Sequence, residues 1–447
     1  LLKRLAMMSG PLNYDSRPMF RIMACTFSLC QAALTTAMMS SSIALGDHLG
    51  STTNAMLYAV SLVSSLSIAP WVNNSLTPKR GLLLGFVCCT LYLLCFSVVT
   101  CRGLTFLVPT YWRQVVALVG AIFGGLGISI TWTGQGLFFS LVVQELTETE
   151  RIEKMAMAVA ADEDSYALER WTSKLSSSFA VWIMSTECAV KIQFSVMQVF
   201  LPDAEWLYFV LPALSLFATL CFSLTPELRA LNKNPMSTCS KAIATVKLWP
   251  DLTLWLISLT NVAFGLSAAW VNSHVNAHLL LEAFADPKYV GFASGMTTAI
   301  AGVTSRMTGC TAKKGPFMAL GSIAFLLLGL LSKIPSNWMA NGAWILVFYV
   351  LHGIGRGVFE STNKAVFGQN FPKEKGLGAF ANLLVQTTLA AVAGHLLSAH
   401  GLEDLVTYML IACASLILPG FFLASFLQRK RWRAVTSLSV TAQISAV

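Results

Sequence analysis

Three ionisable residues lie in one long apolar stretch, residues 341–371. Arg356, Glu360 and Lys364 follow one another at four-residue steps, so a helix would place all three on one face. A charged group at the centre of a bilayer costs at least about 2.5 to 3.5 kcal/mol on insertion scales, so such groups pair or line a polar pathway. We interpret the three as a locally neutralised ladder. The alternative makes Glu360 a proton or cation acceptor, and Arg356 either an anion clamp or a modulator of the pKa of Glu360.

A second ionisable pair lies in the apolar run at 177–200. Glu187 precedes Lys191 by four residues, which predicts an ion pair within one helix. Glu187 and Glu360 are the only acids deep inside apolar runs. A proton-coupled carrier needs a carboxyl that loses and regains a proton, so Glu187 and Lys191 are also candidates for an ion pathway.

His274, His278 and Glu282 also follow four-residue steps. This spacing suits a divalent metal, but the sequence identifies no further ligand. We therefore expect a hydrated rim at this position, with no bound metal and no cofactor.

The composition is that of a membrane protein. Of 447 residues, 55% are hydrophobic and 11% are charged, and the mean hydropathy is +0.66. Soluble proteins have about 25% charged residues. The net charge of +9 comes from short basic patches between apolar runs, which argues against a nucleic-acid partner. The eleven cysteines are scattered, without the spacing of a disulfide framework or a zinc site.

A helix needs about 20 apolar residues to cross the hydrocarbon core of a bilayer. Runs that meet this length predict an all-α membrane protein with twelve transmembrane helices at 19–44, 54–73, 81–100, 114–143, 177–200, 205–223, 251–275, 290–309, 316–333, 341–366, 377–398 and 403–427. Residues 224–250 contain two prolines and separate two groups of six runs. The predicted organisation is an N-terminal segment 1–18, a six-helix half 19–223, a linker 224–250, a second six-helix half 251–427 and a basic tail 428–447.

The basic residues indicate orientation. If the N-terminus is cytoplasmic, most of the 30 lysines and arginines fall in cytoplasmic segments, as the positive-inside rule requires. We therefore expect both termini in the cytoplasm; the sequence does not identify the membrane. The acidic segment 144–176 is expected to be a solvated connecting helix or, alternatively, a docking helix for a partner protein.

The two predicted halves share local patterns. GLGISITWTGQG at 125–136 and GIGRGVFESTNK at 353–364 both open with Gly-x-Gly, and the basic loops 78–81 and 312–315 lie at a similar offset. Together they predict two six-helix pseudo-repeats in parallel, as in facilitator-type transporters.

The run GGLGISITWTGQGLFFS at 124–140 resembles the fourth-span motif of the uncoordinated-ninety-three family, which comprises ion-channel regulatory proteins of the major facilitator superfamily. Residues 353–381 resemble its tenth-span segment, although Arg356 stands where an acidic residue is expected and Glu360 where a small amide is expected. The resemblance implies a facilitator fold with a role in ion transport, channel regulation or membrane-protein trafficking.

In that superfamily the first, fourth, seventh and tenth spans line a central cavity. The resemblance therefore implies these cavity candidates: Gln31, Thr35, Thr131, Trp132, Gln135, Asn261, His352, Arg356 and Glu360. Trp132 could instead serve helix packing, and Gln31 and Asn261 could make hydrogen bonds between helices.

The leading hypothesis is a secondary transporter of a small solute or ion that works by alternating access in a lipid bilayer. The alternative is a non-transporting protein that regulates an ion channel or escorts another membrane protein. No phosphate-binding loop with Lys-Ser or Lys-Thr, GxSxG elbow or HExxH pair occurs, so nothing suggests an ATP-driven pump or an enzyme.

Overall fold

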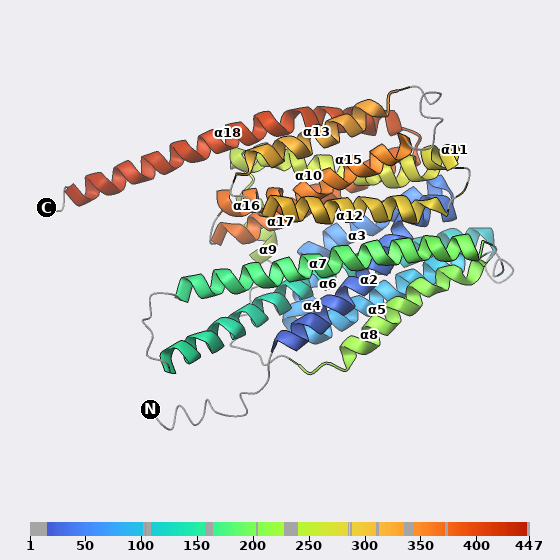
Figure 1. Ribbon diagram of the computed structural model, residues 1–447, viewed down its shortest axis with the longest axis horizontal. Helices are drawn as coiled ribbons and strands as arrows, with labels where there is room; N and C mark the ends of the chain where they lie inside the picture. The colour runs from blue at the N-terminus through green and yellow to red at the C-terminus, as the bar shows by residue number, and fades with distance from the viewer. Residues whose placement is uncertain are drawn as a thin grey trace.

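The computed structural model is built from helices throughout the part of the chain that it describes (Figure 1). The described residues are 16–101, 103, 109–156, 164–202, 204–227, 240–284, 286, 288–309, 313–334, 344–371 and 374–444.

The helices that precede the predicted linker are α2 (Ser16–Ala44), α3 (Asp47–Leu66), α4 (Ile68–Ser75), α5 (Pro78–Thr100), α6 (Thr110–Ala156), α7 (Asp164–Phe200), η3 (Glu205–Phe209) and α8 (Val210–Ser223). Those that follow are α9 (Ser240–Lys247), α10 (Leu252–Trp270), η4 (Val271–Leu279), α11 (Leu280–Phe284), α12 (Tyr289–Gly309), α13 (Gly315–Leu331), α15 (Ile345–Val358), η6 (Phe359–Asn363), α16 (Lys364–Asn370), α17 (Glu374–Ala399) and α18 (Glu403–Ile444). The segments η4 and η6 are π-helical, so α10 continues through η4 into α11, and α15 through η6 into α16.

Local capping explains several helix boundaries. The Thr77 side chain accepts a hydrogen bond from the backbone N–H of Arg80, and Pro78 occupies the first turn of α5, where its missing N–H costs nothing. The Asp251 side chain caps α10 by accepting from the backbone N–H of Thr253. Gly46, between α2 and α3, has a φ of 84°, a conformation that favours glycine.

Seven helices in the described residues are long and apolar enough to cross a membrane: Ser16–Ala44, Pro78–Thr100, Tyr111–Ile152, Trp206–Ser223, Leu252–Phe284, Gly378–Ala399 and Glu403–Lys430. The shorter helix Gly315–Leu331 is also apolar. The chain is therefore a multi-pass membrane protein. Each of the twelve predicted ranges overlaps a described helix, but the number that cross the bilayer stays a prediction.

The buried hydrophobic side chains form two large clusters. One cluster draws its buried residues from between Met19 and Phe222, whereas the other consists of Met39 and residues between Leu248 and Ala424. Figure 1 shows the corresponding layers, with α2 to α8 in one and α10 to α18 in the other. We call them the N-layer and the C-layer.

The two Gly-x-Gly stretches make equivalent contacts in the two layers. A Cβ on Gly125 of α6 would lie 2.5 Å from the Leu57 carbonyl oxygen of α3, and one on Gly353 of α15 would lie 2.8 Å from the Thr297 carbonyl oxygen of α12. Two residues further on, Gly127 faces Cys89 of α5, while Gly355 faces Phe325 of α13. The shared pattern thus marks positions where three helices approach too closely for a side chain.

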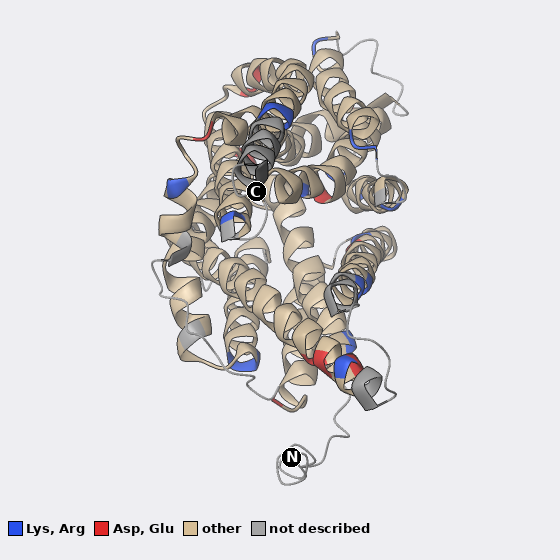
Figure 2. Cartoon of the chain, turned by 90° about the vertical axis from the view of Figure 1, so that its left-hand side faces the viewer, with Lys and Arg blue, Asp and Glu red and all other residues tan. Residues whose placement is uncertain are grey.

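The two ends of the helical body differ. The end of α6, the start of α7 and the end of α18 project beyond one end, which we call the extension end (Figure 1). The turns α2–α3 and α17–α18 lie at the opposite end. Viewed from the extension end, most of the ribbon carries no charged residue (Figure 2). Residues 1–15 and 228–239, parts of the predicted N-terminal segment and linker, lie outside the described residues.

Candidate functional site

A buried cluster of charges joins the two layers. The Glu187 carboxylate of α7 accepts from both terminal nitrogens of Arg356 of α15, at 2.9 Å to Oε1 and 2.7 Å to Oε2. Lys191 Nζ donates to Glu187 Oε1 at 2.6 Å. The hydroxyl of Thr298 in α12 donates to the same oxygen at 3.2 Å. We call Glu187, Lys191, Arg356 and Thr298 the charge cluster.

Small residues of α12 allow the close approach that this cluster requires. A Cβ on Gly291 would lie 2.5 Å from the Lys191 carbonyl oxygen of α7, and one on Gly295 would lie 2.9 Å from the Ile192 side chain. Thr298 follows on α12 and can reach the ion pair. Glu187, Thr298 and Arg356 each lie close to the middle of a range that the sequence predicts to span the membrane.

The cluster is sealed except at Arg356. The side chains of Glu187 and Lys191 are 4% and 5% exposed, whereas that of Arg356 is 18% exposed. Two cations surround one carboxylate, so the ionised cluster carries a net charge of +1. A bidentate arginine–carboxylate pair has the geometry that best offsets the desolvation of both groups. Arg356 is the charged member of the cluster with the most accessible side chain.

The prediction of a charge ladder is confirmed for Glu360 and Lys364 but is wrong for Arg356. Glu360 pairs with Lys364 at 2.5 Å, and Glu187 pairs with Lys191, as their spacing predicts. Arg356 does not complete the ladder with Glu360; it pairs with Glu187, 169 residues away in the sequence. The carboxylate of Glu187 offers bidentate geometry in a buried setting, whereas Glu360 is 26% exposed and already paired.

Gln31 and Asn261 make hydrogen bonds between helices of their own layer. Gln31 of α2 donates to Thr131 of α6 at 3.1 Å. The side-chain amide of Asn261 in α10 donates to Gln386 of α17 at 2.7 Å and accepts from Asn363 of η6 at 2.6 Å. Both side chains are buried, so these contacts fit the structural alternative for Gln31 and Asn261.

The remaining predicted residues lie apart from the charge cluster's hydrogen bonds. Trp132 is 40% exposed and packs edge-on against Phe27 at 5.0 Å between ring centroids. Gln135 is buried one helical turn further along α6. The buried His352 stacks on Phe264, with its ring 6.0 Å away, and the Thr35 hydroxyl bonds the Ala32 carbonyl of its own helix.

Thr298 is the member of the charge cluster that was not predicted from the sequence. It accepts from Lys191 and from Arg356 at 3.5 Å each while donating to Glu187, so it touches every charge in the cluster. A lone threonine in an apolar run carries no signal of its own. Only the packing of α12 against α7 reveals its role.

The layers are also joined toward the opposite end. Ser51 of α3 bonds Ser273 of η4 at 2.9 Å, and Asn276 of η4 bonds the Met39 carbonyl of α2 at 3.1 Å. Tyr58 of α3 stacks on His395 of α17 at 5.8 Å. These polar and aromatic contacts extend from the charge cluster toward the opposite end.

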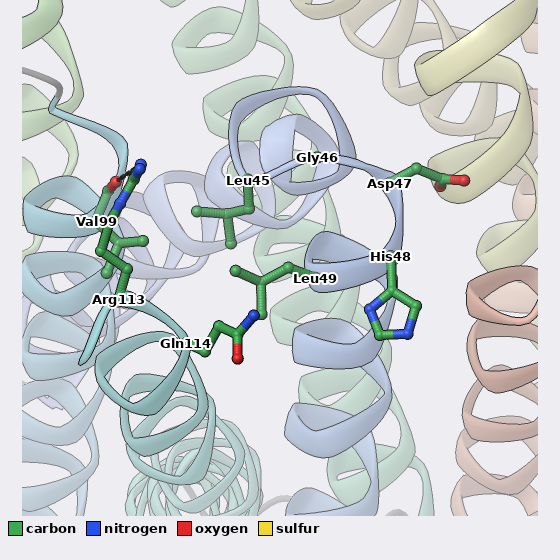
Figure 3. Close-up of a pocket in the computed structure, with 8 residues that line it drawn as sticks. All are labelled: Leu45, Gly46, Asp47, His48, Leu49, Val99, Arg113 and Gln114. Atoms are coloured by element: carbon green, nitrogen blue, oxygen red, sulfur yellow. Dashed lines mark hydrogen bonds between the residues drawn. The ribbon is translucent and has the colours of Figure 1, made fainter. Parts of the chain in front are cut away.

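A pocket of about 360 Å³ lies at the opposite end, away from the charge cluster. It lies in the N-layer beside the α2–α3 turn and is lined by Leu45, Gly46, Asp47, His48, Leu49, Val99, Arg113 and Gln114. Arg113 donates to the Val99 carbonyl at 2.6 Å, and the Asp47 carboxylate points away from the other lining side chains (Figure 3). This pocket contains none of the predicted site residues.

Comparison with solved structures identifies the fold. The nucleoside transporter NupG aligns with a TM-score of 0.59 at 11% identity, over 91% of this chain and 98% of its own. A D-xylose-proton symporter aligns with a TM-score of 0.61 at 12% identity, over 90% and 96%. A structure of a proton-dependent oligopeptide transporter aligns with a TM-score of 0.59 at 12% identity, over 94% and 99%. No family model and no curated protein matches the sequence. The chain therefore shares the fold of these transporters.

Proposed function

We propose that this protein is a secondary transporter of a small solute that carries an anionic group. The observation that supports this most directly is the Glu187–Arg356 ion pair, which joins α7 of the N-layer to α15 of the C-layer. In the proposed twelve-span arrangement this pair lies at mid-depth. In alternating access the two layers rotate against each other around such a contact, so the contact must change during the cycle. The free energy of the ion pair therefore affects the equilibrium between the two conformations. In this proposal the chain has twelve spans in two six-helix halves, 19–223 and 251–427.

The charge balance supports an anionic substrate. The cluster keeps an excess positive charge in apolar surroundings, which is costly unless a counter-charge arrives. Arg356 is the exposed member and has the planar donor group that recognises carboxylates and phosphates. The anionic group of the solute would share Arg356 with Glu187, and Lys191 and Thr298 would hold Glu187 in place.

We further propose that the extension end is cytoplasmic and that the structure represents a conformation closed on the other side of the membrane. The clustering of basic residues on the segments at the extension end supports this orientation. Ser51–Ser273 and Asn276–Met39 join the layers on the far side of the charge cluster, which supports closure there. Solute would then reach Arg356 from the cytoplasm in this state.

A regulatory role, as in the uncoordinated-ninety-three family, is the second candidate. It is favoured by the two motif matches and by the projecting ends of α6 and α7, where Trp171 Nε1 donates to Glu150 at 2.9 Å and Arg17 lies 5.0 Å from the Trp171 ring. This ordered contact could present a surface to a membrane partner such as a channel. The Glu187–Arg356 ion pair between the two layers favours the carrier instead.

Uptake into liposomes tests the proposal. Purified protein is reconstituted, and radiolabelled monocarboxylates and phosphate esters are screened under an imposed pH or potassium gradient. We expect saturable uptake of at least one anion class, which Arg356→Gln abolishes and Glu360→Gln reduces less. No uptake across the screen, together with a channel that co-purifies with the wild type, would overturn the carrier proposal in favour of the regulator.

A further inference from the structure

We propose that the opposite end carries a Zn²⁺ site formed by His274, His278 and Glu403, with Asp47 as a supporting carboxylate. One ligand atom from each of the first three residues lies within 4.8 Å of the others. The two histidines come from η4 and Glu403 begins α18, so two elements of the C-layer that are distant in the sequence converge. Two imidazoles and one carboxylate form a ligand set that zinc commonly takes.

The polar contacts around the cluster fit a metal site. His278 Nε2 lies 3.2 Å from Asp47 Oδ2, which leaves Nδ1 of the same ring for a metal. A carboxylate on the second nitrogen of a ligating histidine fixes its tautomer and orientation. His274 Nδ1 is buried and has no hydrogen-bond partner among the described residues. A buried ring nitrogen without a partner is costly, and metal binding to this ring would account for its position.

The spacing of the ligand atoms is close to what the metal requires. Ligands about 2.0 to 2.1 Å from a tetrahedral zinc lie about 3.3 Å from one another. The observed atoms must therefore draw together by at most about 1.5 Å, a movement within reach of side-chain rotation. The His278 side chain is 44% exposed and has room to turn.

The π-helical segment explains why Glu403, and not Glu282, completes the cluster. The four-residue pattern predicts Glu282 as the third member, but η4 ends at Leu279 and α11 follows it. A π-turn adds one residue to the helix, which rotates every later side chain by about 100°. The rotation moves position 282 off the face of the two histidines, and the start of α18 supplies the carboxylate.

A metal bound here would strengthen the contact between the layers. Asp47 is the first residue of α3 in the N-layer, whereas the three ligands belong to the C-layer. Zinc bound to His278 makes the other ring N–H a stronger hydrogen-bond donor, and this strengthens the hydrogen bond from His278 to Asp47. Bound Zn²⁺ therefore favours the state in which the opposite end is closed. This inference concerns a site separate from Arg356 and does not depend on the identity of the solute.

Zinc titration of the purified full-length chain in detergent tests the site. Binding is measured by competition with a chromogenic chelator, and melting temperature is measured with Zn²⁺ and with excess EDTA. We expect one Zn²⁺ per chain and a melting temperature that Zn²⁺ raises and EDTA restores. Glu403→Gln and His278→Ala should weaken binding more than about 100-fold, and Asp47→Asn about 10- to 100-fold.

Glu282→Gln is the matched control because it removes the carboxylate at the expected four-residue step but outside the cluster. It should keep wild-type affinity. Equal weakening by Glu282→Gln and Glu403→Gln would overturn the assignment, as would a wild type that neither binds stoichiometric Zn²⁺ nor melts at a higher temperature with it. The wild-type melting measurement does not depend on whether any variant folds.

Discussion

Removal of the Glu187 charge should destabilise the protein more than removal of Arg356. Glu187→Gln removes the carboxylate that pairs with both Lys191 and Arg356, so the cluster goes from +1 to +2. Arg356→Gln leaves the Glu187–Lys191 pair intact at 2.6 Å, so the cluster becomes neutral. The two substitutions break the same ion pair but have opposite electrostatic consequences.

The magnitudes follow from burial. An uncompensated charge left after one partner of a buried pair is removed costs about 3 to 5 kcal/mol, and both remaining cations here lie in largely sealed surroundings. Arg356→Gln should cost about 1 to 3 kcal/mol, the range for an imperfectly satisfied buried polar group. Glu360→Gln should cost at most about 1 kcal/mol because Lys364, its partner, is 38% exposed.

The assay is thermal unfolding of the purified variants in one detergent, with size-exclusion profiles as a check on folding. The expected order of melting temperatures is Glu360→Gln above Arg356→Gln above Glu187→Gln. In a double-mutant cycle, the Glu187→Gln and Arg356→Gln combination should be less destabilised than the sum of the single variants by about 0.5 to 3 kcal/mol. Equal melting temperatures for the Glu187 and Glu360 variants would refute the view that Glu187 is the buried counter-charge.

Four further substitutions test the packing of the helices. Gly125→Ala should lower the stability in thermal melting by about 1 to 3 kcal/mol, because the new Cβ meets the Leu57 backbone. Gly136→Ala, whose new Cβ has nothing within 4 Å, should stabilise α6 by about 0.5 to 1 kcal/mol. The reverse order would contradict the close approach of α3 and α6. Asn261→Leu should lower the stability by about 1 to 3 kcal/mol because it strands two amides, and an unchanged melting temperature would show that this network is not formed. Trp132→Ala should change the Michaelis constant for uptake if the ring faces solute, and an effect on melting temperature alone would leave it a packing residue.

The sequence allowed good prediction of features that depend on neighbours along the chain. Apolar runs located the helices, and four-residue spacing gave the Glu187–Lys191 and Glu360–Lys364 pairs, because partners one turn apart meet on any helix. The Gly-x-Gly stretches pointed to corresponding positions in α6 and α15, where close helix packing permits no side chain.

Features that depend on distant parts of the chain could not be predicted in this way. The partner of Arg356 lies on α7, and no periodic pattern selects one buried acid over another when both are available. Thr298 joins the cluster only because α12 packs on α7. The π-helical η4 changes the number of residues per helical turn between the histidines and Glu282, so the four-residue spacing no longer predicts a shared face. No residue in this segment predicts the π-helix.

In the proposed transport cycle, the two layers alternate around the Glu187–Arg356 contact to carry a solute. Exchange across liposome membranes tests it most directly, with radiolabelled solute outside and either unlabelled solute or buffer inside. A carrier that returns faster when loaded should take up label faster into preloaded liposomes, and Arg356→Gln should remove that acceleration. Absence of uptake into both kinds of liposome, or uptake that Arg356→Gln leaves unchanged, would contradict transport around this contact.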